Sequence, residues 1–89
     1  MQTNPFGTLA DDLKVKSASF GYTVNGDDID TRSETINDSK YGIVTGFAIG
    51  STQNVVAMQF YFSAPNSLQM RVRNLNSNPQ NYTITVYYI

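Results

Sequence analysis

The sequence predicts an all-β protein, a compact antiparallel β-sandwich with a jelly-roll-like arrangement of about six strands. Three observations support this fold class. Residues that favour strands dominate the chain, among them 6 Tyr and 5 Phe, whereas strong helix formers are scarce. Apolar and polar residues alternate over short runs. Turn residues separate these runs at intervals of about ten to thirteen residues, a spacing typical of sandwiches.

The 89 residues have the length of one domain, which we place at residues 13–89, after an N-terminal arm at residues 1–12. The arm is either irregular or contains one helical turn, capped at Thr8 with Asp11 three residues later. A domain this small buries only about 60–65% of its unfolded surface, and the chain has no Cys for a disulfide. We therefore expect tight strand packing and self-association to stabilise the fold.

The first predicted strand covers residues 13–24, and its apolar face changes near Ser17, which predicts a β-bulge there. The Asn-Gly pair at 25–26 follows, and such a pair is the strongest short signal for a β-hairpin. Residues 29–39 are mostly polar, which predicts a short edge strand and a loop.

Two runs in the middle of the chain, residues 41–50 and 55–63, alternate strongly and predict two further strands. One face of the first run is small and flat, so a bulky group can pack closely against it. That small face consists of Gly42, Val44, Gly46 and Ala48. The opposite, larger faces of the two runs consist of Tyr41, Ile43, Phe47 and Ile49, and of Val56, Met58, Phe60 and Phe62.

The last two strands are predicted at residues 68–74 and 82–89, with an Asn-rich segment between them that predicts a hairpin. Their inward side chains are Leu68, Met70, Val72, Tyr82, Ile84, Val86 and Tyr88. Tyr87 and Ile89 then point away from this core, at the end of an aromatic strand. An open aromatic edge promotes aggregation, so we expect either burial between subunits or a central position of this strand in its sheet.

Catalytic chemistry has little support in the sequence. The chain has neither His nor Cys, which excludes a Ser-His-Asp triad and a thiolate nucleophile. Most acidic residues fall at 11–12 and 27–30, without the apolar surroundings that raise a carboxyl pKa. The run 25–30 offers oxygen ligands for calcium but lacks the EF-hand frame, so an Asx-rich turn is favoured. We predict no enzymatic activity, no cofactor and no metal site.

Charge and hydropathy argue against two classes of partner. The net charge is −1, and two Arg residues on one strand, Arg71 and Arg73, are insufficient for a nucleic-acid surface. No apolar run approaches the ~20 residues of a membrane helix. We therefore expect neither a nucleic-acid nor a membrane partner.

The runs KYGIVTGFAIGS, VVAMQFYFS and LQMRVRNLNSNPQNYTITVYYI resemble the small C-terminal domains of tail-fibre, baseplate and other structural proteins of phages that infect Gram-positive bacteria. The resemblance rests on residues 41–49, 68–74 and 82–89. It implies a β-sandwich, often trimeric, displayed on a virion that is assembled in the host cytoplasm, and in some members saccharide binding. Tail-fibre tips usually follow a long shaft, which this sequence lacks, so an excised tip domain and a small decoration protein both stay open.

We thus expect a non-enzymatic virion structural protein, most simply a tail-fibre or baseplate tip that adheres to host saccharides. Sugars are bound by apolar stacking and planar polar partners. The predicted ligand-binding residues are Asp27, Asp28, Asn54, Tyr61, Asn66, Arg71, Asn76 and Asn78. Tyr87 and Ile89 are predicted at an interface of a homo-oligomer, with a trimer favoured and other virion proteins as further partners. The alternative is a capsid decoration, head-fibre or assembly protein without a ligand.

Overall fold

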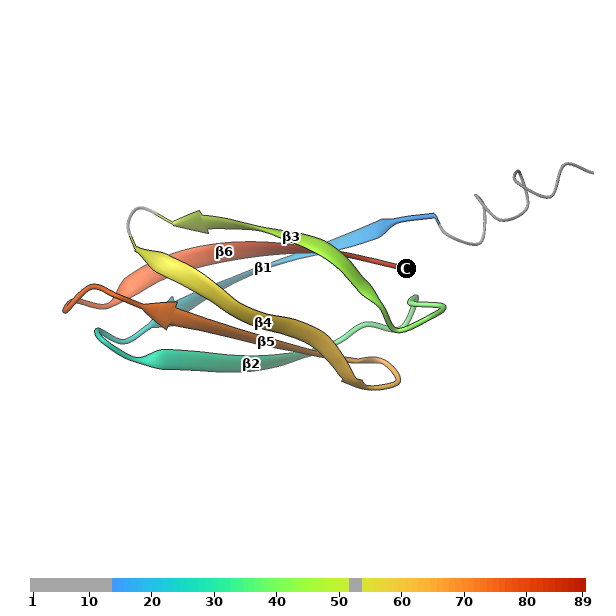
Figure 1. Cartoon of the computed structure of the whole chain (residues 1–89), viewed down its shortest axis with the longest axis horizontal. Coiled ribbons are helices and arrows are strands. Elements are labelled where there is room, and N and C mark those ends of the chain that lie inside the picture. The colour runs from blue at the N-terminus through green and yellow to red at the C-terminus, as the bar shows by residue number, and fades with distance from the viewer. Residues whose placement is uncertain (1–13, 52–53) are drawn as a thin grey trace, which may run out of the picture.

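The computed structural model describes residues 14–51 and 54–89, which form six strands in two three-stranded sheets (Figure 1). The strands are β1 (Lys16–Val24), β2 (Ile29–Thr35), β3 (Val44–Ser51), β4 (Val55–Ala64), β5 (Ser67–Asn74) and β6 (Gln80–Tyr88). Sheet A has the order β1-β6-β3 and sheet B the order β2-β5-β4, and every pairing is antiparallel. The predicted all-β sandwich of about six strands is confirmed.

Most connections lead from one sheet to the other, and only β4 and β5 form a hairpin. The hairpins predicted at the Asn-Gly pair and at the Asn-rich segment are therefore wrong, because β1 and β6 belong to sheet A whereas β2 and β5 belong to sheet B. These two connections pack against each other instead. The Asp27 N–H donates to the Asn76 carbonyl oxygen at 2.8 Å. A Cβ atom at Gly26 would lie 2.0 Å from the Ser77 carbonyl oxygen, so this contact requires glycine.

The two central strands, β5 and β6, supply most of the core. The alternation predicted for both strands is confirmed, because each inward apolar side chain is at most 3% exposed. These side chains are Leu68, Met70, Val72, Tyr82, Ile84, Val86 and Tyr88. Val24, Ile36 and Val55 complete the buried cluster. Because β6 pairs with β1 on one side and β3 on the other, the aromatic last strand is not an open edge.

The β1 strand contains no bulge. Its register with β6 runs without a shift over Lys16–Val24, so the bulge predicted near Ser17 is wrong. The change of apolar face that suggested it involves Val15, which precedes the strand and is 52% exposed, and Leu13. Leu13 lies outside the described residues, as do the predicted arm and its alternative helical turn.

The bulges of this sandwich lie in β3 and β4. The register shifts between Val44 and Gly46 in β3, and twice in β4, between Ala57 and Gln59 and between Phe62 and Ala64. Each shift reverses the strand face, so strict alternation across it assigns side chains to the wrong side. Val55 is consequently buried, and Val44 packs against the core. The residues predicted on the larger faces that are exposed instead are Tyr41, Ile43, Val56 and Met58.

Different chemistry closes the two open sides of the sandwich. Between β3 and β4, the rings of Phe47 and Phe60 pack with their centroids 4.6 Å apart. Phe47 still remains 48% exposed, since both strands are the edges of their sheets. Between β1 and β2 the closure is polar and uses tyrosine hydroxyls and carboxylates. The apolar core is thus flanked by an aromatic side and a charged side.

Candidate functional site

The eight predicted ligand-binding residues lie in three separate regions. The connections β1–β2, β3–β4 and β5–β6 meet at one end of the sandwich, and Asn66 lies in the β4–β5 turn at the other end. Tyr61 and Arg71 lie on the outer face of sheet B. The residues at the end with three connections are Asp27, Asp28, Asn54, Asn76 and Asn78. The structure therefore brings Tyr61 and Arg71 together and separates them from the loop residues.

Backbone requirements explain several of the predicted loop residues. Asp27, Asn54 and Asn66 have φ values of 57°, 45° and 68°, in the left-handed region that Asn and Asp adopt more easily than most residues. The Asp28 carboxylate accepts a hydrogen bond from the Ile29 N–H at 2.8 Å. Among the described residues, no group of three acidic side chains is placed to hold a metal ion. These side chains thus have a structural role in shaping the turns.

Asn74, which the sequence analysis did not single out, fastens this end of the molecule. It is the buried polar residue of the core, with 0% of its surface exposed. Its Nδ2 donates to the carbonyl oxygens of Asn78, Asn25 and Val24 at 2.8, 3.2 and 3.4 Å. Its Oδ1 accepts the Asn76 N–H at 2.9 Å. One amide side chain therefore connects the β1–β2 and β5–β6 connections.

The outer face of sheet B carries a set of polar side chains that we term the arginine face. It is formed by Thr31 and Ser33 of β2, Gln69, Arg71 and Arg73 of β5, and Gln59 and Tyr61 of β4. Tyr61 lies opposite Gln69, and Gln59 lies opposite Arg71. The Tyr61 hydroxyl donates to the Gln69 Oε1 at 3.2 Å. This bond uses only the amide oxygen of Gln69 and neither of its two N–H groups.

Arg71 is the central charged group of the arginine face. It is partly buried, and its Nε atom is enclosed without a hydrogen-bond partner among the described residues. Neither Arg71 nor Arg73 forms an ion pair within residues 14–51 and 54–89. A guanidinium group offers five donors in a planar fork, so this side chain can bind paired oxygen atoms of a ligand.

The acidic residues of β2 point away from the arginine face and into the open side between the sheets. The Tyr22 hydroxyl donates to Glu34, and the Tyr82 hydroxyl donates to Asp30 at 2.7 Å. Burial, followed by these hydrogen bonds, raises the pKa of both tyrosines above the ordinary value. The Arg32 Nε donates to Asp30 at 2.9 Å. The inward direction of these acids leaves the arginine face without a carboxylate among the described residues.

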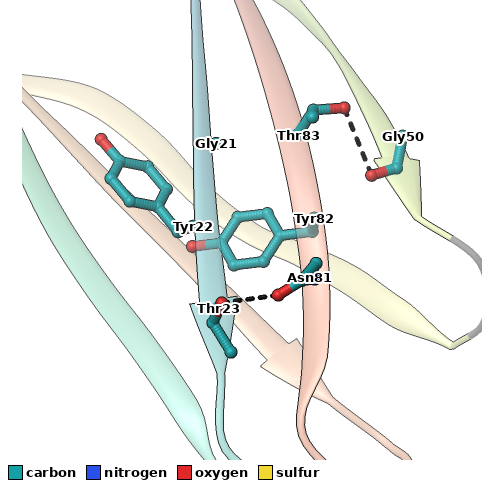
Figure 2. A pocket seen from close by; sticks show the side chains of 7 residues that line it. All are labelled: Gly21, Tyr22, Thr23, Gly50, Asn81, Tyr82 and Thr83. Atoms are coloured by element: carbon teal, nitrogen blue, oxygen red, sulfur yellow. Dashed lines mark hydrogen bonds between the residues drawn. The ribbon is translucent and has the colours of Figure 1, made fainter.

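The outer face of sheet A contains a shallow hollow of about 460 Å³, which we term the glycine trough (Figure 2). Gly21 of β1 and Gly50 of β3 flank Thr83 of β6, and the missing side chains create the space. The Thr83 hydroxyl donates to the Gly50 carbonyl at 3.4 Å. At one end, the Thr23 hydroxyl donates to the Asn81 Oδ1 at 2.6 Å (Figure 2). The trough is therefore a shallow, uncharged hollow with a few polar groups at its rim.

Tyr87 and Ile89, the predicted interface residues, lie at the opposite end of the same strand. Tyr87 is 41% exposed, and a Cβ atom at Gly46 would lie 3.9 Å from its ring. Ile89 is partly buried and exchanges backbone hydrogen bonds with Ile43 at 3.0 and 3.4 Å. The Ser39 hydroxyl also donates to the Ile89 carbonyl at 2.8 Å. The chain itself thus covers part of Ile89, while much of Tyr87 faces solvent.

Gln59, Gln69 and the two trough glycines are site residues that the sequence analysis missed. Strand alternation placed Gln69 beside Arg71 on the outward side, which was a usable signal. Gly21 acquires its neighbour Thr83 from a strand pairing distant in sequence, and no local pattern contains that information. Gln59 lies opposite Arg71 across the β4–β5 hairpin.

The described part of the chain has no helix of a length and apolarity that would span a membrane. Comparison of the chain with protein-family models, curated protein sequences and solved structures finds no match. The geometry of the two outer faces is therefore the basis for assigning a function.

Proposed function

We propose that the chain is a non-enzymatic structural protein of a phage virion, a tail-fibre or baseplate tip that binds a host-surface saccharide through the arginine face. The observation that carries this proposal is the grouping of an exposed Tyr61 ring with Gln69 and Arg71 on adjacent strands. The resemblance of residues 41–49, 68–74 and 82–89 to phage tip domains supports the virion setting.

The arginine face has the chemical groups that a sugar requires. An exposed tyrosine ring can stack on the apolar side of a pyranose. The Gln69 amide and the Arg71 guanidinium are planar donors that can bind neighbouring hydroxyl groups. Since both side chains belong to the central strand β5, the sheet holds them at a fixed spacing. The hydrogen bond between Tyr61 and Gln69 restrains both side chains before a ligand binds, which lowers the entropy cost of binding.

A capsid decoration or assembly protein without a ligand is the second candidate. The exposed Tyr87 and the uncharged outer face of sheet A favour it, because contacts between subunits commonly use aromatic and uncharged surface. In that case the same fold would contact neighbouring virion proteins, and the arginine face would have no saccharide partner.

A binding assay separates these functions. We expect the purified chain to bind a saccharide on a glycan array or in a pull-down with Gram-positive cell walls. The variant Tyr61→Ala should lose at least about tenfold in affinity, because it removes the stacking ring. Tyr41→Ala is the matched control, since Tyr41 is similarly exposed at 44% compared with 39% but lies outside the arginine face. Absence of saccharide binding together with tight binding to capsids would favour the decoration protein.

A further inference from the structure

We propose that the outer face of sheet A is a self-association surface on which a second copy of the chain packs face to face about a two-fold axis. This inference does not depend on the proposed saccharide. It follows from three rows of side chains that cross sheet A, and it defines a role for the glycine trough.

The three rows differ in how far their side chains project from the sheet. The first row contains the exposed Tyr87, with Ser17 on β1 and Gly46 on β3. The middle row contains Thr85, flanked by Ser19 and Ala48. The third row is the glycine trough, in which Gly21 and Gly50 flank Thr83. The face therefore has a bulky ring at one level, small residues at the next and a hollow at the third.

The face that these rows form is complementary in shape to a second copy of itself. Successive rows lie about 7 Å apart, because outward side chains alternate along a strand. A two-fold axis that crosses the strands at the level of Thr85 places Tyr87 of each copy over the trough row of the other. The same contact then occurs twice, as an isologous dimer requires. The small middle row lets the two sheets approach each other at the axis.

Charge favours a second copy as the occupant. The outward side chains of β1, β3 and β6 within the described residues include no Lys, Arg, Asp or Glu. Identical faces that meet about a two-fold axis bring like groups together, so a neutral face causes no charge repulsion between the copies. The arginine face, with Arg71 and Arg73, would repel its own copy. Sheet A is therefore the side that fits another copy.

The size of the face sets the expected strength. Three strands of 8 or 9 residues give a surface of about 14 Å by 30 Å, or roughly 400 Å² for each copy. This is about half the area of a standard stable interface. We therefore expect a weak dimer with a Kd of about 100 μM, so that dilute protein is mostly monomeric. A trimer would require two different contact surfaces on each copy.

Sedimentation equilibrium of the full chain over a range of concentrations tests the proposal. Gly21→Val fills the trough but fits the monomer, because a Cβ atom there meets its nearest neighbours at 3.9 and 4.0 Å. Valine also favours strands, so the variant should melt at the same temperature as the parent or higher. We expect its dimer Kd to rise at least about tenfold. Tyr87→Ser, which removes the opposite half of the contact, should have the same effect.

The matched control is Ser33→Val, which adds a valine to the outer face of β2, an edge strand of sheet B. It should leave the dimer unchanged. Single-cysteine variants give a second readout, because the chain has no Cys. With Thr85→Cys on the axis, a short bis-maleimide should join two copies, whereas Gln69→Cys in sheet B should remain monomeric on the gel. A chain that is monomeric at about 1 mM, far above the expected Kd, would overturn the proposal. A trimer would overturn it as well, and so would a dimer that both Gly21→Val and Tyr87→Ser leave intact.

Discussion

Asn74 shows how one buried polar side chain can determine the geometry of two connections. Its side-chain amide makes four hydrogen bonds to backbone groups of the β1–β2 and β5–β6 connections, where the chain crosses between the sheets. The alternation predicted over residues 68–74 placed Val72 inward but made no assignment for Asn74. It did not predict why an amide is needed there, because that need arises from residues about fifty positions away.

Asn74→Ala should lower the free energy of unfolding by about 2–4 kcal/mol, because it leaves buried backbone groups without partners. Urea unfolding followed by circular dichroism measures this change. Asn81→Ala is the control, because Asn81 is exposed and its side chain accepts a hydrogen bond from the exposed Thr23 hydroxyl. It should cost less than about 1 kcal/mol. Equal losses in the two variants would contradict the role assigned to Asn74.

Tyr88 should make the fold sensitive to alkaline pH. Burial, followed by its hydrogen bond to Asp38, raises the pKa of Tyr88 to about 12. The unfolded chain releases this proton near the ordinary value of about 10. Between these values the folded state binds more protons, so stability is retained below about pH 10 and falls as the pH rises toward 12. Urea unfolding of Tyr88→Phe between pH 8 and about 11.5 should show a shallower decline than the parent chain. Identical slopes would contradict this linkage.

At the scale of the elements, the sequence predicted strands more reliably than their faces or partners. The alternation of β5 and β6 was sufficient to predict which of their side chains face inward, because neither strand contains a bulge and both are central. One register shift in β3 and two in β4 change the strand face, and nothing in the local pattern marks them. The Asn-Gly pair indicated a turn but did not reveal that the next strand joins the other sheet.

The bulge in β4 can be tested with two neighbouring valines. Val55 is 8% exposed and Val56 is 40% exposed, although alternation without a bulge placed Val56 on the same face as Phe60. Val55→Ala should therefore cost about 1–2.5 kcal/mol of unfolding free energy, and Val56→Ala less than about 0.5 kcal/mol. Thermal and urea unfolding of the pair provide the comparison. A larger loss for Val56→Ala would place the bulge elsewhere.

At the scale of the whole molecule, the two outer faces of the sandwich differ in charge and relief. Sheet A presents a neutral surface with a ring and a hollow, and sheet B presents two arginines, two amides and a tyrosine. The sequence indicated a small flat face and an outward Arg71. It did not indicate which strands lie side by side, so Tyr61 and Arg71 were grouped with loop residues that the structure keeps apart.

NMR chemical-shift mapping can determine whether the arginine face binds saccharide. The isotope-labelled chain would be titrated with soluble fragments of Gram-positive cell-wall polysaccharide, while the amide signals and the Arg71 Nε–H signal are followed. We expect the largest shifts at Tyr61, Gln69 and Arg71, including the side-chain signal of Arg71. No shifts at saturating fragment concentration, or shifts confined to the loop residues Asp27 and Asn76, would contradict the claim.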